Sequence, residues 1–264
     1  MILQTERLLL RPWNESDAES LYEYAKDPRV GPVAGWPVHT GVENSREIIR
    51  TVLSAPETYA VCLKGDDRPV GCVGLSMGER SNLVLPEDEG EIGYWIGVPF
   101  WGQGLIPEAV RELIRRAFAE LDLTTLWCGY FDGNEQSRRV QEKCGFRYHH
   151  TCRDIHWRAM DDIRTEHVTR LTREEWEAGT ASETKDAGDE EMETVPDHRG
   201  DPGGSGRPCA AVRSLLRDLS DPAHTGKIRE TGSVLRGPGH LCPGRGMERG
   251  QIRRDEKGGG LQKL

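Results

Sequence analysis

The last third of this 264-residue sequence contains no aromatic residue. All seven Trp, six Tyr and four Phe lie at or before Trp176, whereas residues 177–264 hold 16 of the 31 Gly and 6 of the 15 Pro. Such a segment has too little apolar surface to offset the entropy that it would lose on ordering. We therefore expect one folded domain over residues 1–176, large enough for its own core, and a disordered Gly- and Pro-rich tail over residues 177–264.

The sequence also lacks an excess of positive charge. Its net charge is −9, and residues 1–176 carry 21 Lys and Arg against 29 Asp and Glu. An acidic domain does not displace the counterions of a phosphate backbone, so we expect no nucleic-acid partner. The Arg-rich end of the tail leaves two interpretations open, an anionic partner or a solvated segment.

Long apolar runs and regularly spaced cysteines are missing as well. No run approaches the ~18–20 apolar residues that a membrane span needs, and Glu6, Arg7 and Arg11 interrupt the N-terminus, unlike the apolar core of a signal peptide. The seven Cys show no CxxC or zinc-ligand spacing. We therefore expect no metal, no membrane attachment, reduced thiols and a cytoplasmic location.

The apolar patterns that are present predict a mixed α/β domain. Helices are expected over four segments with apolar residues at helical spacing: 17–26, 43–53, 106–121 and 134–144. Strands are expected over seven segments: 7–11, 58–63, 69–77, 89–98, 125–130, 146–155 and 166–171. Residues 27–41 form a long loop rich in Pro and Gly, and loops of that length inside a domain are usually functional.

A glycine turn, Gly102-Gln103-Gly104, joins the strand over 89–98 to the longest helix. Glycines let the backbone approach a ligand, and the free N–H groups of a helix start point at one spot, which suits an anion. A Walker A loop is absent, and a Rossmann fingerprint needs a third Gly where Pro107 stands. The turn predicts a pyrophosphate site, with an ordinary strand–helix turn as the alternative.

Two separated motifs resemble the GNAT acetyltransferase superfamily. They are WGQGL at residues 101–105, followed by EA at 108–109, and NEQSRRVQEKCGF at residues 134–146. Together with TERLLLRPW at residues 5–13, they are most similar to the RimJ/RimL-like branch, and the resemblance covers residues 1–176. It implies the GNAT fold, α/β (α+β), with a mixed, mostly antiparallel sheet of six to seven strands, about four flanking helices and acetyl-CoA in a cleft beside the strand 89–98.

The resemblance also implies two sets of cofactor contacts. The pyrophosphate of acetyl-CoA is expected on the backbone amides of Gly102, Gln103, Gly104, Leu105 and Ile106. The pantetheine arm is expected along the strand at Tyr94, Ile96 and Val98, with Asn134 as an N-cap, a pantetheine contact or both. Most relatives carry a small residue (Gly or Ala) where Ile106 stands; this departure concerns the room for a side chain there, not the amide contacts.

Acetyl transfer to an amine needs a proton acceptor for the nitrogen and a donor for the oxyanion, while the thiolate leaves with little help. Glu91 is the candidate base, because it shares a strand face with Trp95 and resembles the catalytic Glu of several relatives. A structural or substrate-orienting carboxylate is the alternative. Many relatives have a Tyr where Gln141 stands, so Ser137, which resembles the hydroxyl of the RimL-like branch, is the candidate acid or a hydrogen-bond partner of CoA.

The acceptor is expected at Trp13, Trp36 and His39, unless these residues only pack the loop. The sequence thus predicts an acetyl-CoA-dependent N-acetyltransferase that acts on a primary amine, either a protein N-terminus or a small molecule. A noncatalytic CoA-binding regulatory module of the same fold is the rival function. A homodimer is an expectation from the family alone.

Overall fold

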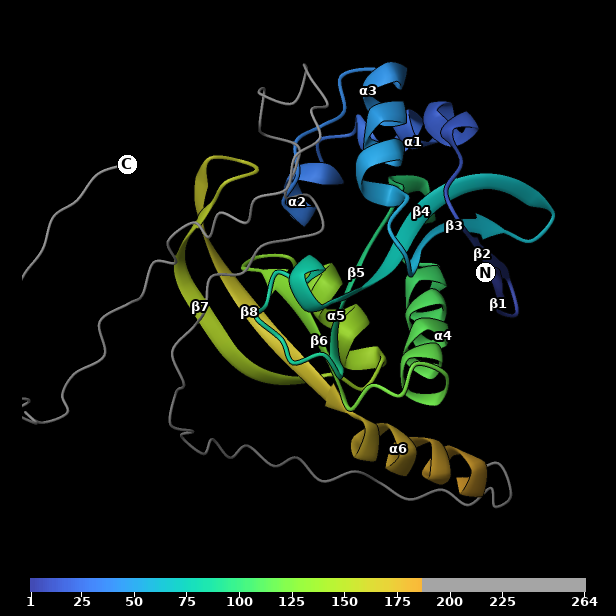
Figure 1. Cartoon of the computed structure of the whole chain (residues 1–264), viewed down its shortest axis with the longest axis vertical. Helices are drawn as coiled ribbons and strands as arrows, with labels where there is room; N and C mark the ends of the chain where they lie inside the picture. The colour runs from blue at the N-terminus through green and yellow to red at the C-terminus, as the bar shows by residue number, and fades with distance from the viewer. Residues whose placement is uncertain (187–264) are drawn as a thin grey trace, which may run out of the picture. The chain divides into compact units, whose positions relative to one another are not determined.

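A computed structural model describes residues 1–186, which build an eight-stranded sheet in the order β1-β2-β3-β4-β5-β6-β8-β7 (Figure 1). All neighbouring strands are antiparallel except β5 and β6, which are parallel. The strands are β1 (Leu3–Gln4), β2 (Leu8–Arg11), β3 (Thr58–Leu63), β4 (Asp66–Met77), β5 (Glu89–Ile96), β6 (Thr125–Phe131), β7 (Arg147–Trp157) and β8 (Asp162–Thr172).

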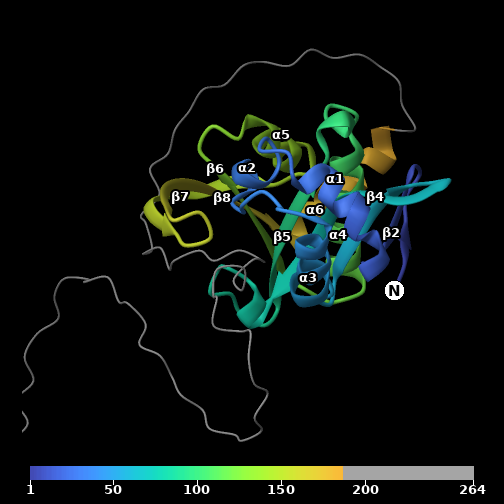
Figure 2. The same cartoon turned by 90° about the horizontal axis from the view of Figure 1, so that it is seen from above.

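Helices cover both faces of this sheet (Figure 1 and Figure 2). The α-helices are α1 (Ala18–Ala25), α2 (Gly31–Ala34), α3 (Val42–Ile48), α4 (Leu105–Ala119), α5 (Glu135–Lys143) and α6 (Arg173–Asp186). A single π-helical turn over Ile49–Leu53 continues α3. Helices α4 and α5 lie against one face, and α1 and α3 lie against the other.

The two apolar faces follow from the periodicity of the sequence. Helix α4 buries Ala109, Val110, Leu113 and Ile114 against β2, β4 and β5, as its 3.6-residue stripe predicts. On the opposite face, α1 and the π turn after α3 bury a second apolar cluster against β3 and β4. Burying each large aliphatic side chain stabilises the fold by roughly 1.5–3 kcal/mol. Apolar packing therefore fixes helices on both faces of the sheet.

The sheet splits between β5 and β6. These strands pair only where Glu89, Gly90 and Glu91 face residues 125–127, at the start of both strands. Past Glu91 the edge of β5 no longer has β6 beside it, although β4 stays paired along the other edge up to Ile96. A passage through the sheet opens at this point.

The predicted mixed α/β architecture is confirmed, with two differences in the number of elements. The sheet has eight strands rather than six or seven, because β1 has only two residues and shows no alternation. Six α-helices occur in residues 1–186 rather than about four: α2 lies within the predicted loop 27–41, and α6 was not predicted. Both escape a periodicity test, since α2 spans one turn and α6 is mostly polar.

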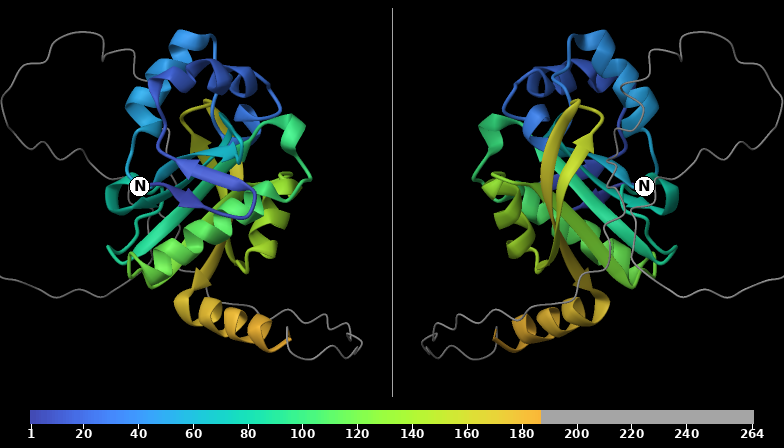
Figure 3. Two further views of the ribbon diagram at one scale, coloured as in Figure 1. Left: turned by 90° about the vertical axis from the view of Figure 1, so that its right-hand side faces the viewer. Right: turned by 90° about the vertical axis from the view of Figure 1, so that its left-hand side faces the viewer.

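Helix α6 crosses the predicted domain boundary. It leaves the end of β8 and runs from Arg173 to Asp186, so residues 177–186 are helical, which corrects the expectation of disorder for this stretch (Figure 3). Trp176 anchors the helix, with its ring 5.4 Å from that of Phe118 on α4. The remainder of the predicted tail, residues 187–264, lies outside the described residues.

Candidate active site

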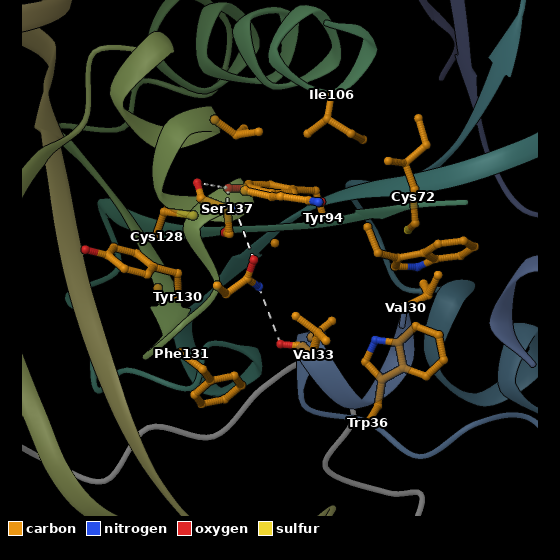
Figure 4. A pocket seen from close by; sticks show the side chains of 18 of the residues that line it. Val30, Val33, Trp36, Cys72, Tyr94, Ile106, Cys128, Tyr130, Phe131 and Ser137 are labelled. Carbon is orange, nitrogen blue, oxygen red and sulfur yellow. Dashed lines mark hydrogen bonds between the residues drawn. The ribbon is translucent and has the colours of Figure 1, made fainter. Parts of the chain in front are cut away.

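A cavity of about 990 Å³ lies where β5 and β6 diverge. It runs from the glycine turn before α4, through the split in the sheet, to aromatic side chains on the opposite face (Figure 4). Tyr94 and Ser137 face it from one side, and Trp36, Val33 and Phe131 from the other. This volume lies at the upper end of the range that small-molecule and cofactor sites occupy.

The glycine turn has the backbone geometry of an anion site. Gly102 and Gly104 have φ values of +75° and +74°, in the left-handed region that glycine tolerates best. Gly104 is the N-cap of α4, and no side chain caps that helix start, so its first N–H groups remain available to a ligand. Arg7 braces the turn from outside by donating a hydrogen bond to the Gln103 carbonyl at 2.9 Å.

Most of the predicted cofactor contacts come together around this cavity. Eight of the predicted contact residues are among those that line the cavity: Tyr94, Ile96, Gly102, Gly104, Leu105, Ile106, Asn134 and Ser137. Val98 instead packs toward the apolar cluster under α1 and α3. The side chain of Gln103 points outward and donates to the Pro99 carbonyl at 2.9 Å.

A network of hydroxyl and amide groups lies at the start of α5. The Ser137 hydroxyl lies 2.9 Å from the Tyr94 hydroxyl and accepts a hydrogen bond from Gln141 Nε2 at 3.2 Å. Gln141 in turn accepts a bond from the Thr169 hydroxyl on β8, and Asn134 caps α5 through the Ser137 amide. Burial raises the pKa of Tyr94 well above 10, so its hydroxyl stays protonated.

Two of the three predicted acceptor residues line the cavity. Trp36 is buried there with its ring 5.9 Å from that of Trp95. His39 also lines it, with Nδ1 2.8 Å from the Ser45 hydroxyl, and burial lowers its pKa to about 4. Trp13 stacks on Trp95 at 6.3 Å, within the apolar cluster under α1 rather than among the lining residues.

Glu91, the predicted base, is held tightly by a neighbouring loop. Its carboxylate accepts hydrogen bonds from the Ser81 hydroxyl at 2.9 Å, the Asn82 amide at 2.8 Å and Asn82 Nδ2 at 3.0 Å. Burial raises its pKa, although these hydrogen bonds oppose the shift. The residues that line the cavity include Asn82 but not Glu91, so Asn82 lies between the Glu91 carboxylate and the cavity.

A second carboxylate, Glu166 on β8, lines the same cavity and was not singled out from the sequence. It is only 5% exposed, and its Oε2 atom has no hydrogen-bond partner among the described residues. Burial, and then the negative charge of Glu91, raise its pKa to about 8. The sequence did contain a sign of this burial. Glu166 lies two residues before Val168 on a predicted strand, so the two side chains share the buried face.

Residues 7–147 match the family described as the acetyltransferase (GNAT) domain. The chain belongs to this family. The predicted GNAT membership is therefore confirmed, and the chain is a GNAT acetyltransferase.

Three known proteins are similar to this chain, two in sequence and one in fold. An uncharacterized N-acetyltransferase, p20 of Bacillus licheniformis, is 30% identical over 157 residues, which cover 58% of this chain and 85% of p20. A putative ribosomal N-acetyltransferase, YdaF of Bacillus subtilis, is 44% identical over 73 residues, covering 28% of this chain and 40% of YdaF. The microcin C7 self immunity acetyltransferase MccE, solved in complex with acetyl-CoA and AMP, shares the fold with a TM-score of 0.53 at 16% identity, covering 63% and 93% of the two chains.

Residues 1–186 offer neither a metal site nor a membrane-spanning helix. No group of three or more His, Cys, Asp or Glu in residues 1–186 is arranged to hold a metal ion. Across the same residues, no helix has both the length and the apolar character needed to cross a bilayer.

Proposed function

We propose that this GNAT acetyltransferase moves the acetyl group of acetyl-CoA to a primary amine, which attacks the thioester directly. The observation that carries the proposal is the single cavity that joins the glycine turn, the Tyr94–Ser137 hydroxyl pair and a buried carboxylate. A site for an anion, a proton donor and a proton acceptor are the three elements that this reaction needs. The acetyl-CoA bound to MccE, a protein of the same fold, supports this choice of donor.

In this proposal the cofactor lies along the split in the sheet. Its pyrophosphate binds the free amides at the start of α4, where Gln103 contributes only its backbone. The pantetheine arm follows β5 past Glu91, because β6 has diverged there and that edge lies beside the cavity. The thioester then lies near Tyr94 and Ser137, which face the cavity from β5 and α5.

The reaction proceeds through a tetrahedral intermediate. A neutral amine attacks the carbonyl carbon, a backbone N–H of β5 stabilises the oxyanion, and the C–S bond breaks. Ser137, coupled to the Tyr94 hydroxyl, gives its proton to the departing thiolate; Tyr94 reprotonates Ser137 and recovers its own proton from water. Two carboxylates are candidates for the base. Glu91, predicted from the sequence, would receive the proton through a water molecule, because Ser81 and Asn82 hold its carboxylate. Glu166 lines the cavity itself.

Two classes of acceptor fit the proposal. The similarity to YdaF, a putative ribosomal N-acetyltransferase, favours an amine of a ribosomal component such as a protein N-terminus. The apolar side chains Val33, Trp36 and Phe131 around the far end of the cavity favour an amine with an apolar body. Both present a primary amine to the same place, so a screen has to include both.

The test is release of free thiol from acetyl-CoA in the presence of peptides with free N-termini and of small primary amines. We expect thiol release that depends on the amine, together with an acetylated product detected by mass spectrometry. Peptides with a blocked N-terminus are the matched control. Binding of acetyl-CoA with no thiol release for any amine would instead favour the noncatalytic module.

A further inference from the structure

Glu91 and Glu166 lie on the same face of the sheet, on either side of β6. In the sheet register, Glu91 is opposite Trp127, and Glu166 is opposite Phe131. Gly129 lies between these two positions of β6, and a Cβ atom added there would overlap the Glu166 carboxylate. The Glu166 side chain therefore lies across Gly129, at the split where the cavity crosses the sheet.

The two carboxylates differ in how they are satisfied. Glu91 accepts hydrogen bonds from Ser81 and Asn82 on both of its oxygens, whereas Glu166 Oε2 is buried with no partner in the described part of the chain. Burying an unpartnered carboxylate oxygen is costly, and in a native structure such an atom points to a cause such as a catalytic role or a bound water or ion. A cationic ligand that donates hydrogen bonds would remove this cost.

Few other charged groups act on Glu166. The negative charge of Glu91 on β5 acts on Glu166. The Cys128 thiol of β6 is not directed at Glu166, because it donates to the Ile92 carbonyl at 3.1 Å. Arg164, two residues earlier on β8, is engaged with Asp162 and the Pro32 carbonyl. His167 points to the opposite face, toward Thr151 and Asp132. Within residues 1–186, the surroundings of Glu166 thus provide negative charge and burial without a neutralising cation.

We propose that Glu166 is the carboxylate that binds the ammonium group of the acceptor and takes its proton. This inference rests on the proposed function and assigns the base of the same site to Glu166 instead of Glu91. Glu91 is then a positioning residue that raises the proton affinity of Glu166 through its negative charge.

The proton balance is complete with the groups named. The ammonium gives one proton to Glu166, and the neutral nitrogen attacks the thioester carbon to form the C–N bond. The C–S bond breaks as the second proton passes from the nitrogen to water in the cavity. Ser137 protonates the thiolate, Tyr94 reprotonates Ser137, and the water returns the second proton to Tyr94. An ammonium and acetyl-CoA become an amide, CoA thiol and one proton, which Glu166 releases to solvent.

The carboxylate pair also restricts the acceptor. An amine that carries its own carboxylate on the adjacent carbon would be repelled by Glu91 and Glu166, whereas an alkyl amine or a peptide N-terminus would not. We therefore expect phenethylamine to be acetylated with a kcat/KM at least about tenfold higher than that of phenylalanine, since like charges in a buried site repel strongly.

The experiment compares the full-length wild type with Glu166→Gln and Glu91→Gln in the thiol-release assay. Glu166→Gln is expected to lower kcat by about a hundredfold or more, with an unchanged dissociation constant for acetyl-CoA and unchanged thermal unfolding. Glu91→Gln is expected to keep more activity and to move the ascending limb of kcat/KM against pH to lower pH, because Glu166 loses a like-charged neighbour. Glu166→Leu, tested in parallel, removes the carboxylate even if the Gln variant folds poorly.

A second readout separates proton transfer from a structural role. An acceptor that is already neutral at the assay pH, such as hydroxylamine, should restore most of the rate of Glu166→Gln relative to wild type. Full activity of Glu166→Gln, or a loss that hydroxylamine does not reduce, would overturn the assignment. If the wild type releases no thiol with any amine, it is the proposed function that fails.

Discussion

The hydroxyl oxygen of Tyr94 lies 2.9 Å from that of Ser137, although the two residues are 43 positions apart in the chain. Strand β5 presents Tyr94 to the face covered by α4 and α5, and the first turn of α5 presents Ser137. The carboxylates Glu91 and Glu166 lie on the opposite face of the sheet. The split between β5 and β6 thus separates the hydroxyl pair on one face of the sheet from the two carboxylates on the other.

Removing either hydroxyl should slow the departure of the thiolate. Ser137→Ala and Tyr94→Phe are each expected to lower kcat by about tenfold to a hundredfold, near the lower end for general acids, because a thiolate already leaves readily. The double variant should lose little more than either single variant, since the two hydroxyls act as one unit. Thiol-release kinetics and the dissociation constant of acetyl-CoA measure both effects; full turnover of Ser137→Ala would contradict its role as the acid.

A side chain at Gly104 should weaken cofactor binding. In Gly104→Ala the left-handed backbone would cost about 1–2 kcal/mol, and the helix start would shift to relieve it. We expect the dissociation constant of acetyl-CoA to rise about tenfold, which corresponds to a loss of ~1.4 kcal/mol of binding free energy. The kcat/KM for S-acetylpantetheine, which lacks the pyrophosphate, should not change. Gly65→Ala is the matched control, because Gly65 has φ +89° in the turn between β3 and β4 and lies outside the cavity. Equal effects of the two variants on binding would rule out a pyrophosphate site at Gly104.

His39 should make the fold sensitive to mild acid. Burial lowers its pKa from 6.5 to about 4, so between these values the unfolded chain binds a proton that the folded chain does not. The contribution to stability is therefore fully present above pH 6.5 and is lost as the pH falls toward 4, by at most about 3 kcal/mol.

Urea unfolding at several pH values checks this expectation. The free energy of unfolding of the wild type should fall more steeply than that of His39→Gln between pH 6.5 and 4. His156→Gln is the control, since the side chain of His156 is 58% exposed and loses little water on folding. Parallel curves for wild type and His39→Gln would show that burial of His39 does not govern acid sensitivity.

Truncation after Trp176 should leave acetyl-CoA binding and turnover intact, because the described cavity residues lie between Leu21 and Glu166. Truncation after Thr172 should lower the melting temperature. It deletes both the ring contact between Trp176 and Phe118 and the hydrogen bond from Arg173 to the Leu123 carbonyl. Differential scanning fluorimetry and the thiol-release assay compare the two proteins. Loss of binding or turnover in the longer one would mean that residues after Trp176 belong to the active site.

The elements predicted best from the sequence are those with strong local patterns. Helix α4 follows its apolar stripe, and β3 has the predicted bounds. Elements held by tertiary contacts were missed. Helix α2 is a single turn whose Pro32 carbonyl accepts a bond from Arg164, and α6 is held by Trp176 against Phe118 and by Arg173 on the Leu123 carbonyl. Propensity and periodicity carry no information about such distant partners.

By itself, the sequence determined the family, the glycine turn and the shared strand face of Glu91 and Trp95. These features are local: they depend on a missing Cβ, on a helix that begins directly after the turn, and on the two-residue period of a strand. Only the tertiary structure decided which carboxylate borders the cavity, because β8 lies beside β6 and Gly129 leaves room for Glu166 there. The order and divergence of the strands set that arrangement, and both result from packing between segments far apart in the chain.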